Sequence, residues 1–278
     1  MSLSRRFLSI RYLLSFFGVI FVVVTLGNSV SYAGSSTNIA SAALDRFFPT
    51  SGATFEAGDA YSNDVSAIQT VIYNKCLESA GFQGIPYSPQ PYVGNNTEFP
   101  NLPYLRMHGF SASEGPTPNP TKGLSASEKK AYNQQSSDCS QKVSAKFASL
   151  QSLGAPLQSE WMGIVSQIDQ TKAFRKGIKE FSSCAAKSGV DVTGINSFFQ
   201  YMGKQMNESG PSEAVQLHLA GIYATCLTPA ETVRDNLRAT ARQNFLSSNA
   251  EQIKQLTNQV NSIVKVLGDE YHIKWQTN

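Results

Sequence analysis

Residues 76–82 read Cys-Leu-Glu-Ser-Ala-Gly-Phe, and residues 184–190 read Cys-Ala-Ala-Lys-Ser-Gly-Val. Both stretches have the form Cys-x4-Gly followed by an apolar residue, and they begin 108 positions apart. One further cysteine follows each stretch, at Cys139 and Cys226. This order of cysteines predicts a disulfide-stapled body made of two related helical halves.

The N-terminus has the pattern of an export signal. Three arginines precede an apolar run over residues 12–26, and Ser31-Tyr32-Ala33 places small residues where a signal peptidase reads. We therefore expect residues 1–33 to be a signal peptide that is cleaved before Gly34. The alternative is an uncleaved signal anchor, in which residues 12–30 make the protein's one membrane contact, although the run is shorter than the ~18 residues of a committed span.

The charge balance of the chain depends on this segment. The whole chain has 23 basic and 20 acidic residues, and Arg5, Arg6 and Arg11 account for the excess. The mature chain is therefore formally neutral. A neutral body gives no electrostatic reason to expect nucleic acid or an anionic membrane as a partner.

Four cysteines in an exported chain predict two disulfides. Of the three possible pairings, Cys76–Cys139 and Cys184–Cys226 are favoured because they keep each half self-contained. Loops of these lengths stabilise a fold by about 4 kcal/mol each in the chain-entropy model. Consecutive cysteines are at least 42 positions apart, which disfavours both a metal site and a redox pair. We expect no metal and no cofactor.

Composition and periodicity divide the chain into segments. Residues 34–62 are rich in Ser, Ala, Gly and Thr and are expected to form a flexible tether with some local order near Leu44 to Phe48. Residues 63–150 are assigned to a first helical half that contains a Pro/Tyr-rich loop over 83–123, and residues 151–278 to a second half with a long C-terminal helix. The fold class is all-α, a helical bundle.

Apolar spacing and capping signals place the helices. Helices are expected over residues 63–80, 125–150, 156–170, 173–187, 193–206 and 211–226. Thr228-Pro229-Ala230-Glu231 resembles a helix start, with Pro at the first helical position and Glu as a capping residue. The helix that it opens is expected to run to about Leu267.

The last helix carries an apolar stripe at heptad spacing. Its members are Leu246, Ile253, Val260 and Leu267 at one position and Leu256 and Ile263 at the other, with Asn249 interrupting the second row. Such a stripe packs inside its own domain or pairs with another chain. Oligomerisation through this helix is therefore one hypothesis, which an exposed stripe from Ile253 to Leu267 would favour.

The Pro/Tyr-rich loop supplies the candidate binding residues. Tyr87, Tyr92, Tyr104 and Phe110 alternate with prolines that exclude a long helix. Aromatic rows of this kind bind proteins, peptides or sugars. The competing interpretation is that the rings hold a long loop against the helical core.

The order of several short motifs is similar to that of a group of poorly characterised secreted and lipid-anchored proteins of actinobacteria. The motifs are the Cys-x4-Gly-Phe phrase, Met107-His108-Gly109-Phe110, the stretch 124–132, and Cys226 followed by the stretch 243–249. The resemblance covers residues 63–267 and implies an extracytoplasmic location without supplying an activity. Such proteins often carry a lipid-attachment cysteine, which this chain lacks, and a Trp where Phe181 stands.

The sequence contains no recognisable catalytic motif. The three histidines are His108, His218 and His272, and none belongs to a metal-ligating pattern; His218 is interpreted as a residue at the edge of the core. The leading hypothesis is a non-catalytic protein, secreted or associated with the cell envelope, that interacts with a protein or envelope component. The alternatives are a cell-wall-directed hydrolase that uses His108 with nearby acids, and the oligomer described above.

Overall fold

The computed structural model describes residues 39–87, 92, 94–110, 119–209 and 212–271. Regular secondary structure in these ranges is helical, which confirms the all-α class. The helices are α1 (Ile39–Phe47), α2 (Gly52–Ser79), α3 (Leu102–His108), α4 (Ala126–Ile168), α5 (Lys172–Lys187), α6 (Ile195–Ser209), α7 (Glu213–Ser248) and α8 (Ala250–Tyr271).

The expected signal peptide or anchor, residues 1–33, and its apolar stretch 12–30 lie outside the described residues. Among the residues that are described, no helix has both the length and the hydropathy needed to cross a bilayer.

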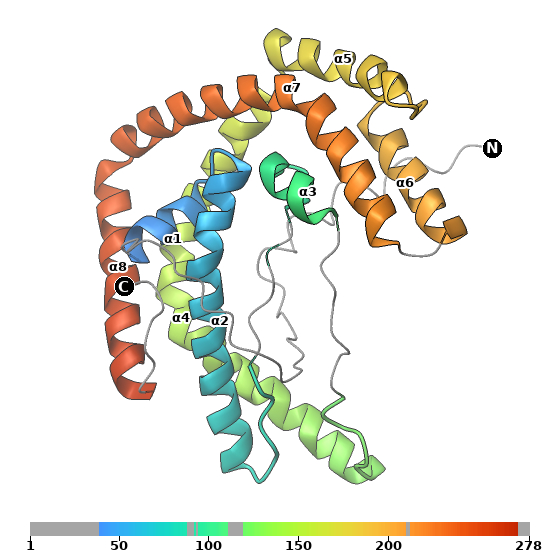
Figure 1. Ribbon diagram of the computed structural model, residues 1–278. Coiled ribbons are helices and arrows are strands. Elements are labelled where there is room, and N and C mark those ends of the chain that lie inside the picture. Colours follow the sequence, from blue (N-terminus) through green and yellow to red (C-terminus); the bar gives the residue numbers. More distant parts are fainter. Residues whose placement is uncertain (1–38, 88–91, 93, 111–118, 210–211, 272–278) are drawn as a thin grey trace, which may run out of the picture.

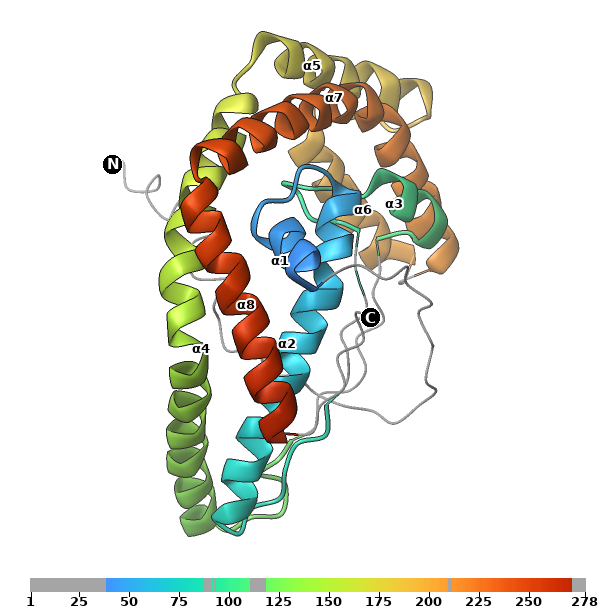
Figure 2. The same ribbon diagram turned by 90° about the vertical axis from the view of Figure 1, so that its left-hand side faces the viewer.

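The arched helix α7 organises the molecule. It curves over the top of the structure, from α6 on one side to α8 on the other (Figure 1). In the perpendicular view, α2, α4 and α8 extend along the long dimension of the molecule, with α1 beside α2 (Figure 2). The two ends of α7 therefore belong to two different groups of packed helices.

A first hydrophobic core lies between α1, α2, α4, α8 and the C-terminal end of α7. Trp161 is fully buried in it, and its indole N–H donates to the carbonyl of Pro49 over 3.1 Å. The ring of Phe245, from α7, packs against both Trp161 and Phe48. This core joins residues from both ends of the described chain, from Ile39 to Tyr271.

The expectation of a flexible tether over residues 34–62 is wrong for its described part. Residues from 39 onward form α1 and the beginning of α2, and Phe48 is fully buried. The small residues that suggested flexibility instead permit close packing. A Cβ atom added at Gly58 would lie 2.6 Å from the Cα of Arg46, so α1 and α2 meet at backbone contact.

A second core lies between α3, α5, α6 and the N-terminal part of α7. Phe181, Phe198 and Tyr223 form its aromatic centre, with ring centroids 5.7–6.0 Å apart. Helix α5 approaches α7 closely, because a Cβ atom at Gly177 would lie 2.8 Å from the Cα of Ala230.

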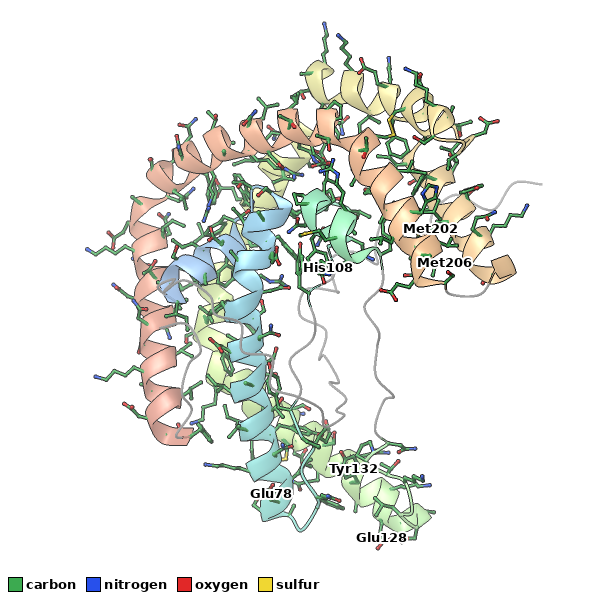
Figure 3. The ribbon with its side chains drawn as sticks, viewed as in Figure 1. Glu78, His108, Glu128, Tyr132, Met202 and Met206 are labelled. Carbon is green, nitrogen blue, oxygen red and sulfur yellow. A yellow bond between two sulfur atoms is a disulfide. The ribbon has the colours of Figure 1, made fainter. Side chains whose placement is uncertain are left out.

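Both predicted disulfide pairings are confirmed. Cys76 of α2 is bonded to Cys139 of α4, and Cys184 of α5 is bonded to Cys226 of α7. The first bond lies near the far end of the α2–α4 pair, beside Tyr132, which Figure 3 labels together with Glu78 and Glu128 of the same end. The second bond joins two helices of the second core.

The expected boundary at residue 150 does not coincide with the division between the cores. Helix α4 is continuous across it, and α8 returns to pack on α1, α2 and α4 rather than on the second half. Sequence order and spatial order differ because α7 carries the chain back to the first core.

Two prolines that were expected to stand at helix starts lie inside helices. Pro156 is within α4 and Pro229 is within α7, so the Thr228–Glu231 start signal is not used. The Thr228 hydroxyl donates to the carbonyl of Ala224 one turn earlier, and Arg106 of α3 also donates to that carbonyl. These bonds lie one residue before Thr225, whose carbonyl is the one that Pro229 leaves without a helical N–H donor.

The helical segment is interrupted instead at Asn249, where α7 ends and α8 begins. Beyond it, the apolar stripe faces the first core, and the side chains of Leu256, Val260, Ile263 and Leu267 are buried there. The exposed stripe that would favour oligomerisation is therefore not present, since the chain's own helices cover it.

Candidate functional site

The four candidate binding residues of the Pro/Tyr-rich loop do not form one surface. Tyr87 is half-buried beside α2, and its hydroxyl donates to the carbonyl of Asn63. Phe110 is buried in the second core, where its ring contacts Phe199 and Tyr223. Phe110 therefore offers no open aromatic face to a partner, and Tyr87 is engaged with α2 through its hydroxyl.

Tyr92 and Tyr104 are brought together. Their rings are edge to face, with centroids 4.9 Å apart, and the Tyr104 hydroxyl donates to the Tyr92 carbonyl over 2.7 Å. The Tyr92 hydroxyl donates to the carbonyl of Gly52 at the start of α2. These contacts attach the loop to the first core, as the competing interpretation of the aromatic residues expects.

Helix α3 is held firmly in this loop. The Asn101 side chain caps it by accepting from the Tyr104 N–H, and Gly109 ends it with a φ of 73° that favours glycine. Leu102 and Leu105 insert into the second core. Helix α3 therefore bridges the two cores, because Tyr104 of the same helix contacts the segment bound to α2.

On the opposite side of α3, Pro103, Met107 and His108 are exposed and Tyr104 is half-buried. We call Pro103, Tyr104, Met107 and His108 the α3 face. Met107 is 66% exposed, more than any other large hydrophobic residue of the described chain. The His108 ring lies 4.3 Å from the ring of Tyr104, and Figure 3 shows it at the end of the helix. The α3 face combines an aromatic ring, a thioether and an imidazole.

A cluster of His108 with two carboxylates in a closed cleft would favour the hydrolase alternative. His108 is exposed and its ring contact is with Tyr104. Across the described residues, no group of three or more His, Cys, Asp or Glu side chains is close enough to hold a metal ion. Within the described residues, His108 therefore does not lie in the closed cluster that would favour this alternative.

A buried ionic cluster underlies the arch of α7. It consists of Asp169, which caps α4, and of Glu231, Arg234, Asp235 and Arg238 on α7. Arg234 forms ion pairs with Glu231 at 2.6 Å and with Asp169 at 3.3 Å, and Arg238 lies 3.6 Å from Asp169. Both arginines are buried, and Arg238 is 0% exposed. The cluster joins α4 to α7.

The same arginines hold the Pro/Tyr-rich loop. Arg234 and Arg238 each donate to the carbonyl of Glu98 over 2.9 Å. The guanidinium groups also lie over aromatic rings, Arg234 over Phe174 and Arg238 over Phe99. One polar cluster thus connects the first core, the second core and the loop.

Burial sets the protonation of this cluster. Desolvation raises the pKa of Glu231 to about 7 and that of Asp235 to about 6, against the opposing effect of the two arginines. Desolvation also lowers the pKa of Arg238 to about 10. Glu231, interpreted from sequence as a capping residue, is instead a buried partner of Arg234.

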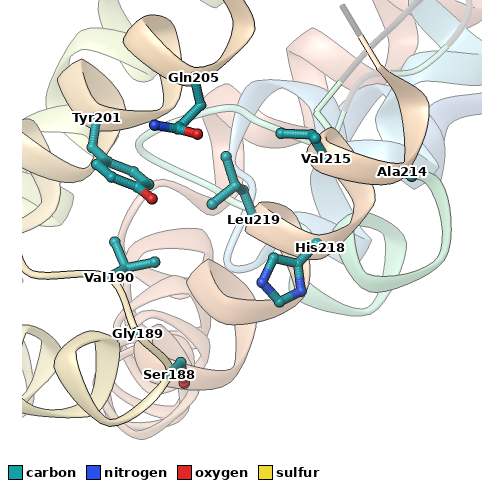
Figure 4. A pocket seen from close by; sticks show the side chains of 9 residues that line it. All are labelled: Ser188, Gly189, Val190, Tyr201, Gln205, Ala214, Val215, His218 and Leu219. Atoms are coloured by element: carbon teal, nitrogen blue, oxygen red, sulfur yellow. The ribbon is translucent and has the colours of Figure 1, made fainter. Parts of the chain in front are cut away.

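A pocket of about 350 Å³ opens at the edge of the second core (Figure 4). Its walls are the turn after α5, one face of α6 and the first turns of α7. The lining residues are Ser188, Gly189, Val190, Tyr201, Gln205, Ala214, Val215, His218 and Leu219. His218, interpreted as a boundary residue, is exposed at its rim.

Sequence reasoning found the disulfides and α3's aromatic residues but missed the ionic cluster and the pocket. The spacing Glu231-x-x-Arg234-Asp235-x-x-Arg238 was the available signal for the cluster. The same spacing is typical of a solvated helix face, so it does not reveal burial.

Comparison with protein-family models, curated proteins and solved structures found no match to this chain.

Proposed function

We propose that this chain is an exported, extracytoplasmic protein that acts by binding a partner protein through the α3 face. Two disulfides within the described helices are typical of an oxidising compartment. The signal pattern over residues 1–33 and the resemblance to secreted actinobacterial proteins support a secreted or cell-envelope location.

The observation that carries the binding proposal is the contrast between the two sides of α3. One side is fixed by Leu102, Leu105 and the bonds of Arg106 to Ala224 and Thr228. The other side exposes Met107 beside the rings of Tyr104 and His108. A rigidly held helix loses little conformational entropy on binding, and thioether and aromatic groups are frequent in protein interfaces.

The α3 face bears few charges, since Arg106 turns toward α7. A complementary partner surface would therefore be apolar at its centre, with hydrogen-bond acceptors for the His108 imidazole. The mature chain is formally neutral, so long-range attraction contributes little to such an encounter.

The test is capture of a partner from cell-envelope extracts by the purified, oxidised mature chain. We expect one stoichiometric partner with the natural chain and none with Met107→Asp, because a charge would be desolvated in the interface. Val266→Asp is the matched control, since Val266 is 55% exposed on α8. Equal capture by Met107→Asp and by the natural chain would refute binding through the α3 face.

A further inference from the structure

The pocket at the edge of the second core has the chemistry of a ligand site that is separate from the α3 face. None of the nine lining residues is Asp, Glu, Lys or Arg, and His218 is the single imidazole among them. A phosphate, a carboxylate or a metal ion would find no opposite charge among them. The lining therefore favours a ligand that is polar but uncharged.

Polar groups and an apolar floor are both present in the pocket. Tyr201 and Gln205 lie one turn apart on α6, across from His218 of α7, with Val190 and Leu219 between them (Figure 4). Val190 and Leu219 are buried members of the second core. The polar groups of Tyr201, Gln205 and His218 lie around the apolar surface of Val190 and Leu219, and packing in the second core holds that surface in place.

The hydrogen-bonding capacity of these three side chains is unused within the described chain. Among the described residues, no protein group forms a hydrogen bond with the Tyr201 hydroxyl, the Gln205 amide or the His218 imidazole. Together they offer donors and acceptors of both kinds, including the two N–H bonds and the oxygen of the Gln205 amide. Tyr201 is half-buried, so part of its ring also remains accessible.

We propose that this pocket binds the terminal unit of a neutral saccharide. A sugar ring has an apolar C–H face that packs on an aromatic ring or an aliphatic floor, and an edge of hydroxyls that both donate and accept. Tyr201, Val190 and Leu219 suit the C–H face, and Gln205 and His218 suit the hydroxyls. The pocket's volume of about 350 Å³ lies at the lower end of the range for small-molecule sites, which limits the buried part of the ligand to one or two sugar units.

The test is titration of the purified, oxidised mature chain with neutral oligosaccharides of glucose, galactose, mannose, arabinose and N-acetylglucosamine. Calorimetry and saturation-transfer NMR measure the binding. A uronic acid oligomer is the charged comparison. We expect saturable binding of at least one neutral oligosaccharide and weaker binding of the charged one. Gln205→Ala and His218→Ala should each raise the Kd by about tenfold, the effect of losing one to two hydrogen bonds.

Leu217→Ala is the matched control, because Leu217 is exposed on α7 next to His218 but does not line the pocket. It should leave the Kd unchanged. His218 is exposed, so its replacement should preserve the fold, and an unchanged melting temperature would verify this. The proposal is overturned if no neutral oligosaccharide binds saturably at millimolar concentration, or if the pocket variants bind as well as the natural chain. Met107→Asp should bind the saccharide normally, so this result is independent of the proposed partner.

Discussion

The guanidinium of Arg238 lies 4.4 Å from the centre of the Phe99 ring, although 139 positions separate the two residues. Both side chains are almost completely buried, and Arg238 also donates to the carbonyl of Glu98. A cation on an aromatic face is favourable when both are shielded from water. This contact attaches the loop between α2 and α4 to the underside of α7.

Replacing Arg238 by Met should destabilise the protein by about 3–5 kcal/mol, because it leaves buried carboxylates with one arginine fewer. Thermal or denaturant unfolding measures the change. Arg175→Met is the control at an exposed position of α5, with an expected change within about 0.5 kcal/mol. Similar losses in both variants would show that the buried cluster does not stabilise the fold.

The ionic cluster should also make stability depend on pH. The pKa values of Glu231 and Asp235, about 7 and about 6, are above the ordinary values of 4.5 and 3.8. The carboxyl groups of Glu231 and Asp235 therefore bind protons more tightly in the folded protein than in the unfolded chain. The contribution to the free energy of unfolding is fully present below about pH 4 and is lost as the pH rises through 6 and 7.

Glu231→Gln isolates this effect, since the amide does not titrate. Denaturant unfolding between about pH 5 and pH 8 should show a smaller decrease in stability for the variant than for the natural chain. A constant difference between the two proteins over this range would contradict the raised pKa of Glu231.

Predictions made from short stretches of sequence are correct where interactions between neighbouring residues determine the structure. The capping box at Ser125 and Glu128 forms as expected, and α5 lies within one residue of its predicted start. The favoured disulfide pairing joins cysteines that are consecutive in the chain, and the helices that carry each pair are adjacent in space. These features depend on neighbouring residues or on chain connectivity.

The features that the sequence did not predict depend on distant contacts. Pro229 remains inside α7 because α3 and the second core hold both flanking turns, so the local start signal has no effect. The α1 segment becomes rigid because α2, α4 and α8 surround it. The neutral pocket combines residues from α5, α6 and α7 that have no common pattern in the chain.

Removal of each disulfide should lower stability by about 4 kcal/mol in the chain-entropy model, since the bonds close loops of 63 and 42 positions. The variants are paired replacements by Ser, Cys76 with Cys139 and Cys184 with Cys226, compared by thermal unfolding. Non-reducing peptide mapping of the natural chain should recover these two links. A Cys76–Cys184 link would contradict the structure.

The tyrosines of the loop should act mainly in stability. Tyr87, Tyr92 and Tyr104 each donate a hydrogen bond to a backbone carbonyl. Replacing all three by Ser should cost about 3–5 kcal/mol in calorimetry, from lost apolar burial and lost hydrogen bonds. The matched triple Phe variant keeps the rings and should lose about half as much. An unchanged melting temperature in the Ser variant would mean that the loop is not held by these rings.

The packing of α1 on α2 can be tested with two glycines that differ in their surroundings. At Gly58 a Cβ atom would lie 2.6 Å from backbone atoms of Arg46, whereas at Gly163, inside α4, it would meet nothing within 4 Å. Gly58→Ala must therefore push α1 away from α2 and should destabilise the protein by about 1–3 kcal/mol. Gly163→Ala should stabilise it by up to about 1 kcal/mol, because alanine favours the helix. We expect the two changes to shift the melting temperature in opposite directions. Equal stabilisation by both would contradict the close packing of α1 on α2 and would support a flexible tether over residues 39–62.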